Sequence, residues 1–215
     1  PVDDDVRRNA LLVADALREA GAIVDEVSLT LPRADVLDAA AIHFAHGFGR
    51  LAEAEAAAHP GEVTAYLPAF AAWAERRAAG RSVLDGLELE SGLHAALAST
   101  FADYDALICP TVGASGFVAG DDYVDHGLTV GGRQVDFYLE SALTLAFNVL
   151  SRCPVLAVPS GVAGNGVPTG VQVVGRPYDD ATPFAVGAAI EAVRPWPSVA
   201  PFGRGDDVGT GAPRR

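Results

Sequence analysis

Two histidines three residues apart are the first candidates for chemistry in this sequence. His43 and His46 lie in an alanine-rich stretch of helical character, and Glu53 or Glu55 follows one or two helical turns later. Such a set could in principle share a metal ion. A helical zinc site, however, has His at positions i and i+4, an adjacent Glu and a third ligand, and this pattern is missing. We therefore expect structural or surface histidines, with no metal and no cofactor.

A serine and two cysteines could act as nucleophiles. Ser160 follows an apolar run in Val-Pro-Ser-Gly-Val, but Pro precedes it and the sharp G-x-S-x-G turn of a nucleophilic serine is absent. We expect Ser160 to serve a turn. Cys109 and Cys153 each precede a proline, and nothing in the sequence indicates the positive surroundings that lower a thiol pKa. Buried structural cysteines are therefore expected.

Two further segments are rich in residues that bind ions or phosphate. The glycines of residues 161–170 lack the lysine of a phosphate-binding loop, and they do not open a helix in a G-x-G-x-x-G pattern. The aspartates within residues 103–125 do not follow the spacing of a twelve-residue calcium loop. A turn and a solvated acidic loop are the expected structures.

The first half of the chain has the periodicity of helices. Apolar residues at helical spacing predict a helix ending near residue 20, and alternation over residues 23–29 predicts a strand. Residues 34–58, 63–79 and 82–104 are then expected to be helical. Because Pro68 lies inside the third of these segments, we expect a kink or a late helix start there.

The second half changes to short apolar runs bounded by Pro and Gly. Residues 106–109, 155–158 and 170–174 are predicted to be buried strands, and Gly-Gly within residues 128–135 predicts a two-residue hairpin. Helices are expected at residues 137–150 and 182–193. Strands alternating with helices predict the α/β class with a mostly parallel or mixed sheet. Residues 203–215 have little to bury and are predicted to form a disordered tail.

Four sequence blocks in one order carry a resemblance to a known family. They are Tyr-Asp-Ala-Leu-Ile-Cys-Pro-Thr at 104–111, Asn148 with Phe-Asn-Val-Leu-Ser-Arg-Cys-Pro at 147–154, Val-Leu-Ala-Val-Pro-Ser-Gly at 155–161, and Gly-Val-Gln-Val-Val-Gly-Arg-Pro at 170–177. This order resembles the carboxy-terminal half of amidase-signature enzymes, whose fold is a mixed sheet covered by helices. The likeness extends to about residue 202, so residues 1–202 are expected to be the carboxy-terminal portion of an amidase domain. The turn after Asn148 departs from the family's Asn-x-x-Gly-x-Pro.

The resemblance implies hydrolysis of a carboxylic amide to an acid plus ammonia or an amine. Members use a Ser nucleophile, a second Ser and a Lys base, but this sequence contains no Lys, so the chain by itself is expected to be inactive. The substrate would be a small-molecule amide, bound by the intact enzyme. One alternative is one subunit of a split amidase; another is a scaffold or binding module that has lost the chemistry.

Site residues are carried over by position, because ligands favour the carboxyl ends of strands in α/β sheets. Cys109, Pro110, Thr111 and Asn148 are the expected pocket or pocket-support residues, whereas Gln172 is expected to brace strands. No catalytic residue is assigned. The cut face of the sheet is expected to bind the catalytic portion or to self-associate.

Composition limits the classes of partner. The 215 residues include 28 acidic and 15 basic residues, with a net charge of -13, which disfavours nucleic acid and anionic membrane surfaces. There is no methionine, so we expect something to precede residue 1 or to have been removed. No membrane span or signal peptide is recognised, and the two cysteines fit a reducing, cytoplasmic setting.

Overall fold

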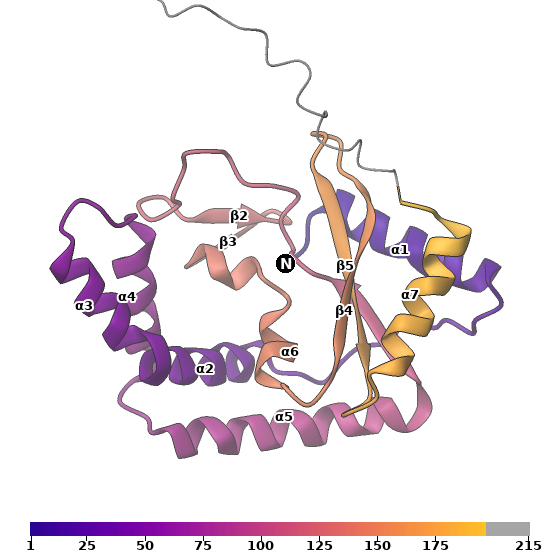
Figure 1. The fold of residues 1–215 in the computed structure, drawn as a ribbon, viewed down its shortest axis with the longest axis horizontal. Coiled ribbons are helices and arrows are strands. Elements are labelled where there is room, and N and C mark those ends of the chain that lie inside the picture. Colours follow the sequence, from indigo (N-terminus) through magenta and orange to yellow (C-terminus); the bar gives the residue numbers. More distant parts are fainter. Residues whose placement is uncertain (197–215) are drawn as a thin grey trace, which may run out of the picture.

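The structure is a computed structural model that describes residues 1–196. A group of helices lies on one side and a β-sheet with two further helices on the other (Figure 1). The helices are α1 (Asp4–Glu19), α2 (Arg33–Phe44), α3 (Arg50–Ala58), α4 (Tyr66–Ala78), α5 (Val83–Asp103), α6 (Leu145–Val149) and α7 (Ala181–Val193). A π-helical turn, η1 (Ala45–Gly49), joins α2 to α3, and a 3-10 turn, η2 (Tyr138–Ser141), precedes α6. Within these residues, no helix is both long and apolar enough to cross a membrane.

The strands form two sheets. β1 (Ala106–Pro110), β4 (Val155–Val162) and β5 (Pro168–Gly175) make a sheet of order β1-β5-β4, with both pairings antiparallel. β2 (Leu128–Val130) and β3 (Arg133–Val135) form a separate hairpin. The three strands and the hairpin are thus confirmed, although β4 is buried on one face only. The pairings in this portion differ from the mostly parallel or mixed sheet expected, because β4 and β5 are consecutive strands joined by a short turn.

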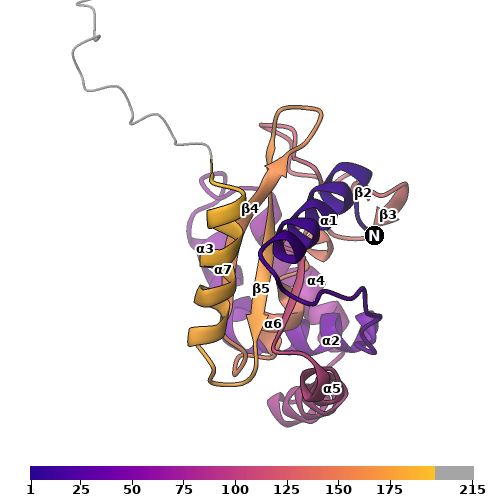
Figure 2. The ribbon, with the colours of Figure 1, turned by 90° about the vertical axis from the view of Figure 1, so that its right-hand side faces the viewer.

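Each face of the three-stranded sheet packs on its own core. Val171 and Val173 of β5 point to the face covered by α1 and α7, where they pack with Val13 and Ile190. Val174 belongs instead to the larger core built mainly by α2, α4, α5 and α6. The alternation of side chains along β5 sends successive residues to opposite cores. Figure 2 shows α1 and α7 lying against the sheet.

Two predicted elements were wrong, at least in part. Residues 23–29 form no strand, and Ile23 is 91% exposed, because no described strand lies beside this segment to complete a hydrogen-bonded ladder. Residues 137–150 form only η2 and α6 rather than one helix. Their middle instead pairs with the loop after β1, where Gly113 N–H donates to Ser141 O at 2.8 Å and Leu143 N–H to Thr111 O at 3.0 Å.

The other helices lie close to their predicted bounds. α4 begins only at Tyr66, which places Pro68 in its first turn, where a missing N–H costs no helical hydrogen bond. This confirms the late start expected there. The helical stretch of residues 34–58 is interrupted by η1 but remains helical throughout. The tail predicted for residues 203–215 lies outside the described residues.

Candidate functional site

The end of β1 and the middle of β5 bring together three of the five predicted site residues. Cys109 pairs with Gln172, and Gln172 pairs on its other side with Ala157 of β4, so these three residues form one row across the sheet. Thr111 follows two residues after Cys109, close to Gly170 of β5. Pro110 occupies the intervening position, where strand alternation sends its side chain to the opposite face.

Hydrogen bonds fix this group. Gln172 is fully buried, and its Nε2 donates to Pro110 O at 3.1 Å, which ties β5 to the end of β1. The Thr111 N–H and hydroxyl both donate to Gly170 O, at 3.0 and 3.2 Å. A Cβ at Gly170 would lie 3.1 Å from Thr111 Oγ1, so the glycine leaves room for that side chain. The strand end is therefore rigid, and the donors of Thr111 are already committed to the backbone.

The two cysteines are unsuited to act as nucleophiles near neutral pH. Burial raises the pKa of the Cys109 thiol to about 11, although the neighbouring Gln172 amide acts in the opposite direction. Burial also raises the pKa of Cys153. Because the thiolate is the reactive form, both residues remain protonated thiols. Neither cysteine is in a disulfide, and their packing against the larger core fits a structural role.

Asn148 does not join this group. It is exposed near the end of α6 and lines a cavity of about 240 Å³ between α2, α5 and α6. His43 and Glu90 line the same cavity. The five predicted residues therefore occupy two places in the fold, one at the end of β1 and one at the end of α6.

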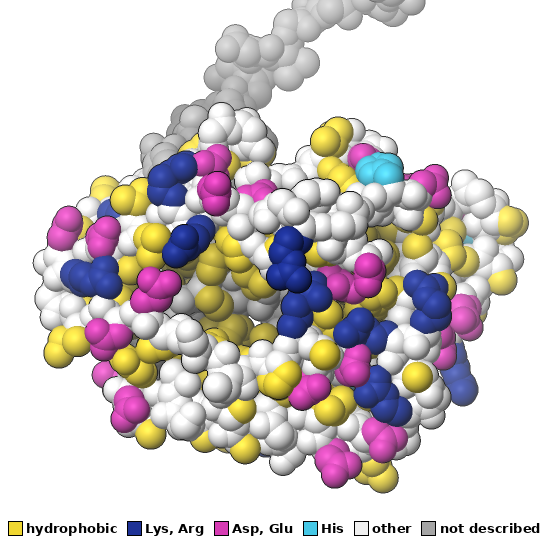
Figure 3. Space-filling view, turned by 180° about the vertical axis from the view of Figure 1, so that it is seen from behind, with side chains coloured by type: hydrophobic (Ala, Val, Ile, Leu, Met, Phe, Trp, Pro, Cys, Tyr) yellow, Lys and Arg dark blue, Asp and Glu magenta, His cyan; other side chains and the backbone are white. Residues whose placement is uncertain are grey.

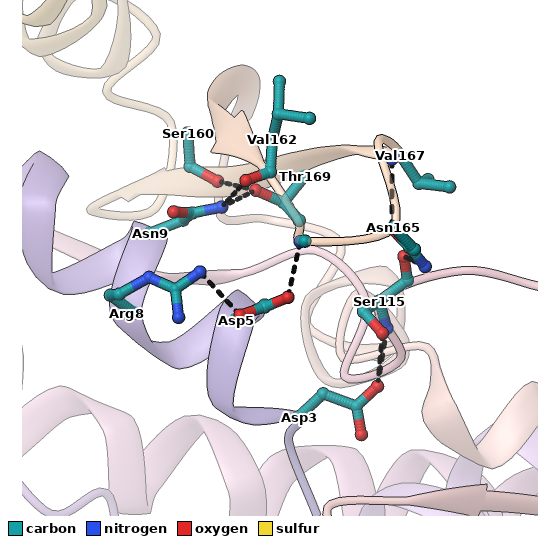
Figure 4. Close-up of polar contacts among 11 residues, drawn as sticks. Asp3, Asp5, Arg8, Asn9, Ser115, Ser160, Val162, Asn165, Val167 and Thr169 are labelled. Carbon is teal, nitrogen blue, oxygen red and sulfur yellow. Dashed lines mark hydrogen bonds and ion pairs between the residues drawn. The ribbon is translucent and has the colours of Figure 1, made fainter.

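Ser160 is a buried structural residue. Its hydroxyl lies 2.8 Å from Thr169 Oγ1, and Asn9 Nδ2 of α1 donates to the same Thr169 oxygen at 2.9 Å and to Val162 O at 3.2 Å (Figure 4). The Ser160 residue is only 3% exposed. This polar network fastens α1 to β4 and β5, and it leaves Ser160 without access to a substrate.

The acidic start of α1 has a larger role than the helix-dipole effect that the sequence indicates. Asp3 accepts hydrogen bonds from Ser115 N–H and hydroxyl, both at 2.8 Å, and from Gly131 N–H at 2.6 Å. Asp5 accepts one from Gly164 N–H at 2.6 Å and pairs with Arg8 (Figure 4). Partial burial acts to raise the pKa of Asp3, but these hydrogen bonds outweigh it and hold that pKa below its ordinary value. Asp3 and Asp5 thus hold the loop after β1, the β2–β3 turn and the β4–β5 turn against α1.

The two histidines of α2 and η1 separate in space. His46 Nε2 lies 2.8 Å from Arg81 O, whereas His43 Nε2 lies 3.7 Å from a carboxylate oxygen of Glu90. Across residues 1–196, no three His, Cys, Asp or Glu side chains are placed to hold a metal ion. Sequence reasoning missed Glu90, which is one of several charges along α5 and becomes distinctive only through its neighbours.

The middle of the molecule is hollowed on one face. In Figure 3 this recess has mainly hydrophobic walls, with arginine and acidic side chains around it. The edge strand β4 also leaves one face uncovered, because Val155, Ala157 and Pro159 are exposed while Val158 and Ser160 are buried. Apolar surface of this kind is typical of a region that another polypeptide covers.

Comparisons with known proteins agree with this geometry. A subunit of the glutamyl-tRNA(Gln) amidotransferase from Brevibacillus brevis is 38% identical over 93 residues, which is 43% of this chain and 17% of that protein. The same-named subunit of Thermosynechococcus vestitus is 36% identical over 99 residues, 46% of this chain and 19% of that protein. The chain thus matches less than a fifth of the length of these curated relatives.

Solved structures show the same fold. A bacterial aryl acylamidase of the amidase-signature family aligns with a TM-score of 0.74 and 23% identity over 91% of this chain and 41% of its own. A 6-aminohexanoate cyclic dimer hydrolase aligns with a TM-score of 0.69 and 23% identity over 91% of this chain and 42% of its own. The helix-covered α/β class is thereby confirmed. The family model described as Amidase matches residues 1–183, so this chain belongs to the amidase family.

Proposed function

We propose that this chain is the carboxy-terminal portion of a hydrolase that cleaves the carbon–nitrogen bond of a small carboxylic amide, giving an acid plus ammonia or an amine. One observation carries the proposal: the family model covers residues 1–183, yet the 215-residue sequence has no Lys to act as the family's base. A serine hydroxyl is a poor nucleophile until a base removes its proton. The serines and the lysine must therefore come from another portion or another chain.

The residues at the end of β1 would support the pocket rather than react. Thr111 and Gln172 are held by hydrogen bonds to Gly170 O and Pro110 O, and Cys109 remains a protonated thiol. These residues present a rigid sheet end against which an acyl group can be held. Rigid support of this kind is what positions a substrate against a nucleophile supplied from elsewhere.

The exposed face of β4 and the apolar recess favour a complementary polypeptide as the partner. That partner would be either the catalytic portion of the same protein or the second subunit of a split amidase. Self-association of this chain through the same surface is the outcome expected when no partner is present. The two unpaired cysteines fit a reducing, cytoplasmic setting for the assembly.

The test measures release of ammonia or amine from simple aliphatic and aryl amides. The purified chain alone should show none. Its mass should be checked alongside a search for a second polypeptide that contains Lys and a Gly-Ser-Ser-Gly loop. Mixing with such a polypeptide should restore hydrolysis, whereas hydrolysis by this chain alone would overturn the proposal. A mixture that forms a complex without hydrolysing any amide would favour the scaffold alternative.

A further inference from the structure

The cavity beside Asn148 combines a carboxylate with apolar walls. It has a volume of about 240 Å³ and is lined by apolar residues of α2 and α6, including Phe44 and Leu145. Its polar lining consists of His43, Glu90, Asn148 and Ser151. None of the functional roles proposed above uses this cavity.

Glu90 is the unusual member of this lining. Its side chain is only 12% exposed, and its two carboxylate oxygens lie 3.7 Å from His43 Nε2 and 3.8 Å from His94 Nε2. Both distances exceed that of a hydrogen bond, and no donor among the described residues hydrogen-bonds to this carboxylate. A largely buried carboxylate without a hydrogen-bond donor is costly unless a cation is supplied.

The neighbouring cationic groups do not neutralise Glu90 at all pH values. An imidazole carries its proton only toward acidic pH. Burial, together with the nearby Arg152 guanidinium, lowers the pKa of His94, which therefore gains its proton only in more acidic solution than an ordinary histidine. His43 from α2, His94 from α5 and Arg152 from the loop after α6 are the charged or titratable groups that face Glu90. No ion pair links Arg152 to Glu90 within the described part of the chain.

We propose that this cavity is a binding site for a small primary alkylammonium ion. The ammonium group would donate to the Glu90 carboxylate, with the Asn148 side-chain oxygen and the Ser151 hydroxyl as further acceptors in the same lining. The alkyl chain would contact the apolar wall at Phe44 and Leu145. A carboxylate that lies at the edge of an apolar cavity attracts a cation more strongly than the same group in water. A metal ion fits less well, since no three ligands are placed to hold one in the described residues.

The experiment titrates the 215-residue chain with n-butylammonium chloride by isothermal calorimetry at about pH 8, where imidazoles are neutral. Wild-type protein should bind in a saturable way. Glu90→Gln should weaken binding by about tenfold or more, since a charge-assisted hydrogen bond is lost. Glu88→Gln is the matched control, because it removes the same charge from the same helix at a residue that lines a different groove. This control should bind like the wild type.

Two further measurements do not depend on how well the Glu90 variant folds. 1-Butanol, a neutral analogue, should bind wild-type protein at least about tenfold more weakly than the ammonium ion. At about pH 5 protonated histidines should compete for Glu90 and weaken binding, and His43→Gln should reduce that loss. Equal binding of 1-butanol and butylammonium would overturn the proposal, as would equal affinity of the two glutamate variants or the absence of saturable binding by the wild type.

Discussion

Glu140 offers a sharp test of how the helices are held together. Its side chain is 3% exposed and accepts a hydrogen bond from Trp73 Nε1 at 3.2 Å and one from Arg33 Nη2 at 2.8 Å. It thus connects α2, α4 and η2. Trp73 is itself only 4% exposed, so the indole N–H has no solvent to replace a lost acceptor.

The cost of Glu140→Ala follows from these two contacts. A buried donor left without an acceptor costs about 1–3 kcal/mol. The ion pair adds at most about 1 kcal/mol, because the Arg33 side chain is 50% exposed and therefore screened by water. We expect the free energy of unfolding to fall by about 2–4 kcal/mol, which for a chain of this size lowers the melting temperature by about 5–15 °C. Glu140→Gln keeps an oxygen for Trp73 and should cost only about 1 kcal/mol.

Urea unfolding followed by circular dichroism measures these values, and a double-mutant cycle with Trp73→Phe tests their cause. In the Trp73→Phe background the indole N–H no longer exists, so Glu140→Ala should cost only the ion-pair contribution of about 1 kcal/mol or less. A cost as large in that background as in the wild type would refute the argument that the buried donor dominates.

Three other predictions concern backbone and titratable groups. Arg176 donates to two carbonyl oxygens at the C-terminal end of α5, at 3.1 and 3.2 Å, so Arg176→Ala should lower the free energy of unfolding by about 1–2 kcal/mol, and Arg176→Lys should recover only part of it in urea unfolding. Gly131→Ala should destabilise more than Gly132→Ala in thermal melts, because both glycines have positive φ but only at Gly131 would a Cβ meet backbone, 2.6 Å from a carbonyl oxygen. With a pKa of about 11, Cys109 is thiolate in only about one molecule in ten thousand at pH 7, so iodoacetamide should alkylate it far more slowly than a free thiol.

A fourth prediction concerns acid stability. The pKa of Asp3 is lowered in the folded chain, so its stabilising contribution is complete above the unfolded-state value and is lost as the pH falls through the folded value. Unfolding measured between about pH 5 and pH 2 should show this loss, since an ordinary Asp titrates near 3.9. Asp3→Asn should make the pH dependence shallower. An unchanged profile would contradict the hydrogen-bonding role assigned to Asp3.

The sequence by itself determined the elements whose signals are local. The glycine pair of the β2–β3 turn adopts the positive φ values that a two-residue hairpin requires. The short apolar runs of β1, β4 and β5 are too short and too continuous for surface helices, and the helical periodicity of α1 and α7 was equally clear. The four ordered blocks also indicated the family correctly, because each block combines a strand with the turn that follows it.

Only the tertiary structure decided the rest. Whether residues 23–29 form a strand depends on a neighbouring ladder, and the helix expected over residues 137–150 is broken because its backbone pairs with the loop after β1. The same holds for the sites: Asn148 resembles a partner of Cys109 in the sequence but lies instead beside Glu90. Periodicity reports which face of an element is apolar, whereas pairing and packing between distant segments determine which side chains meet.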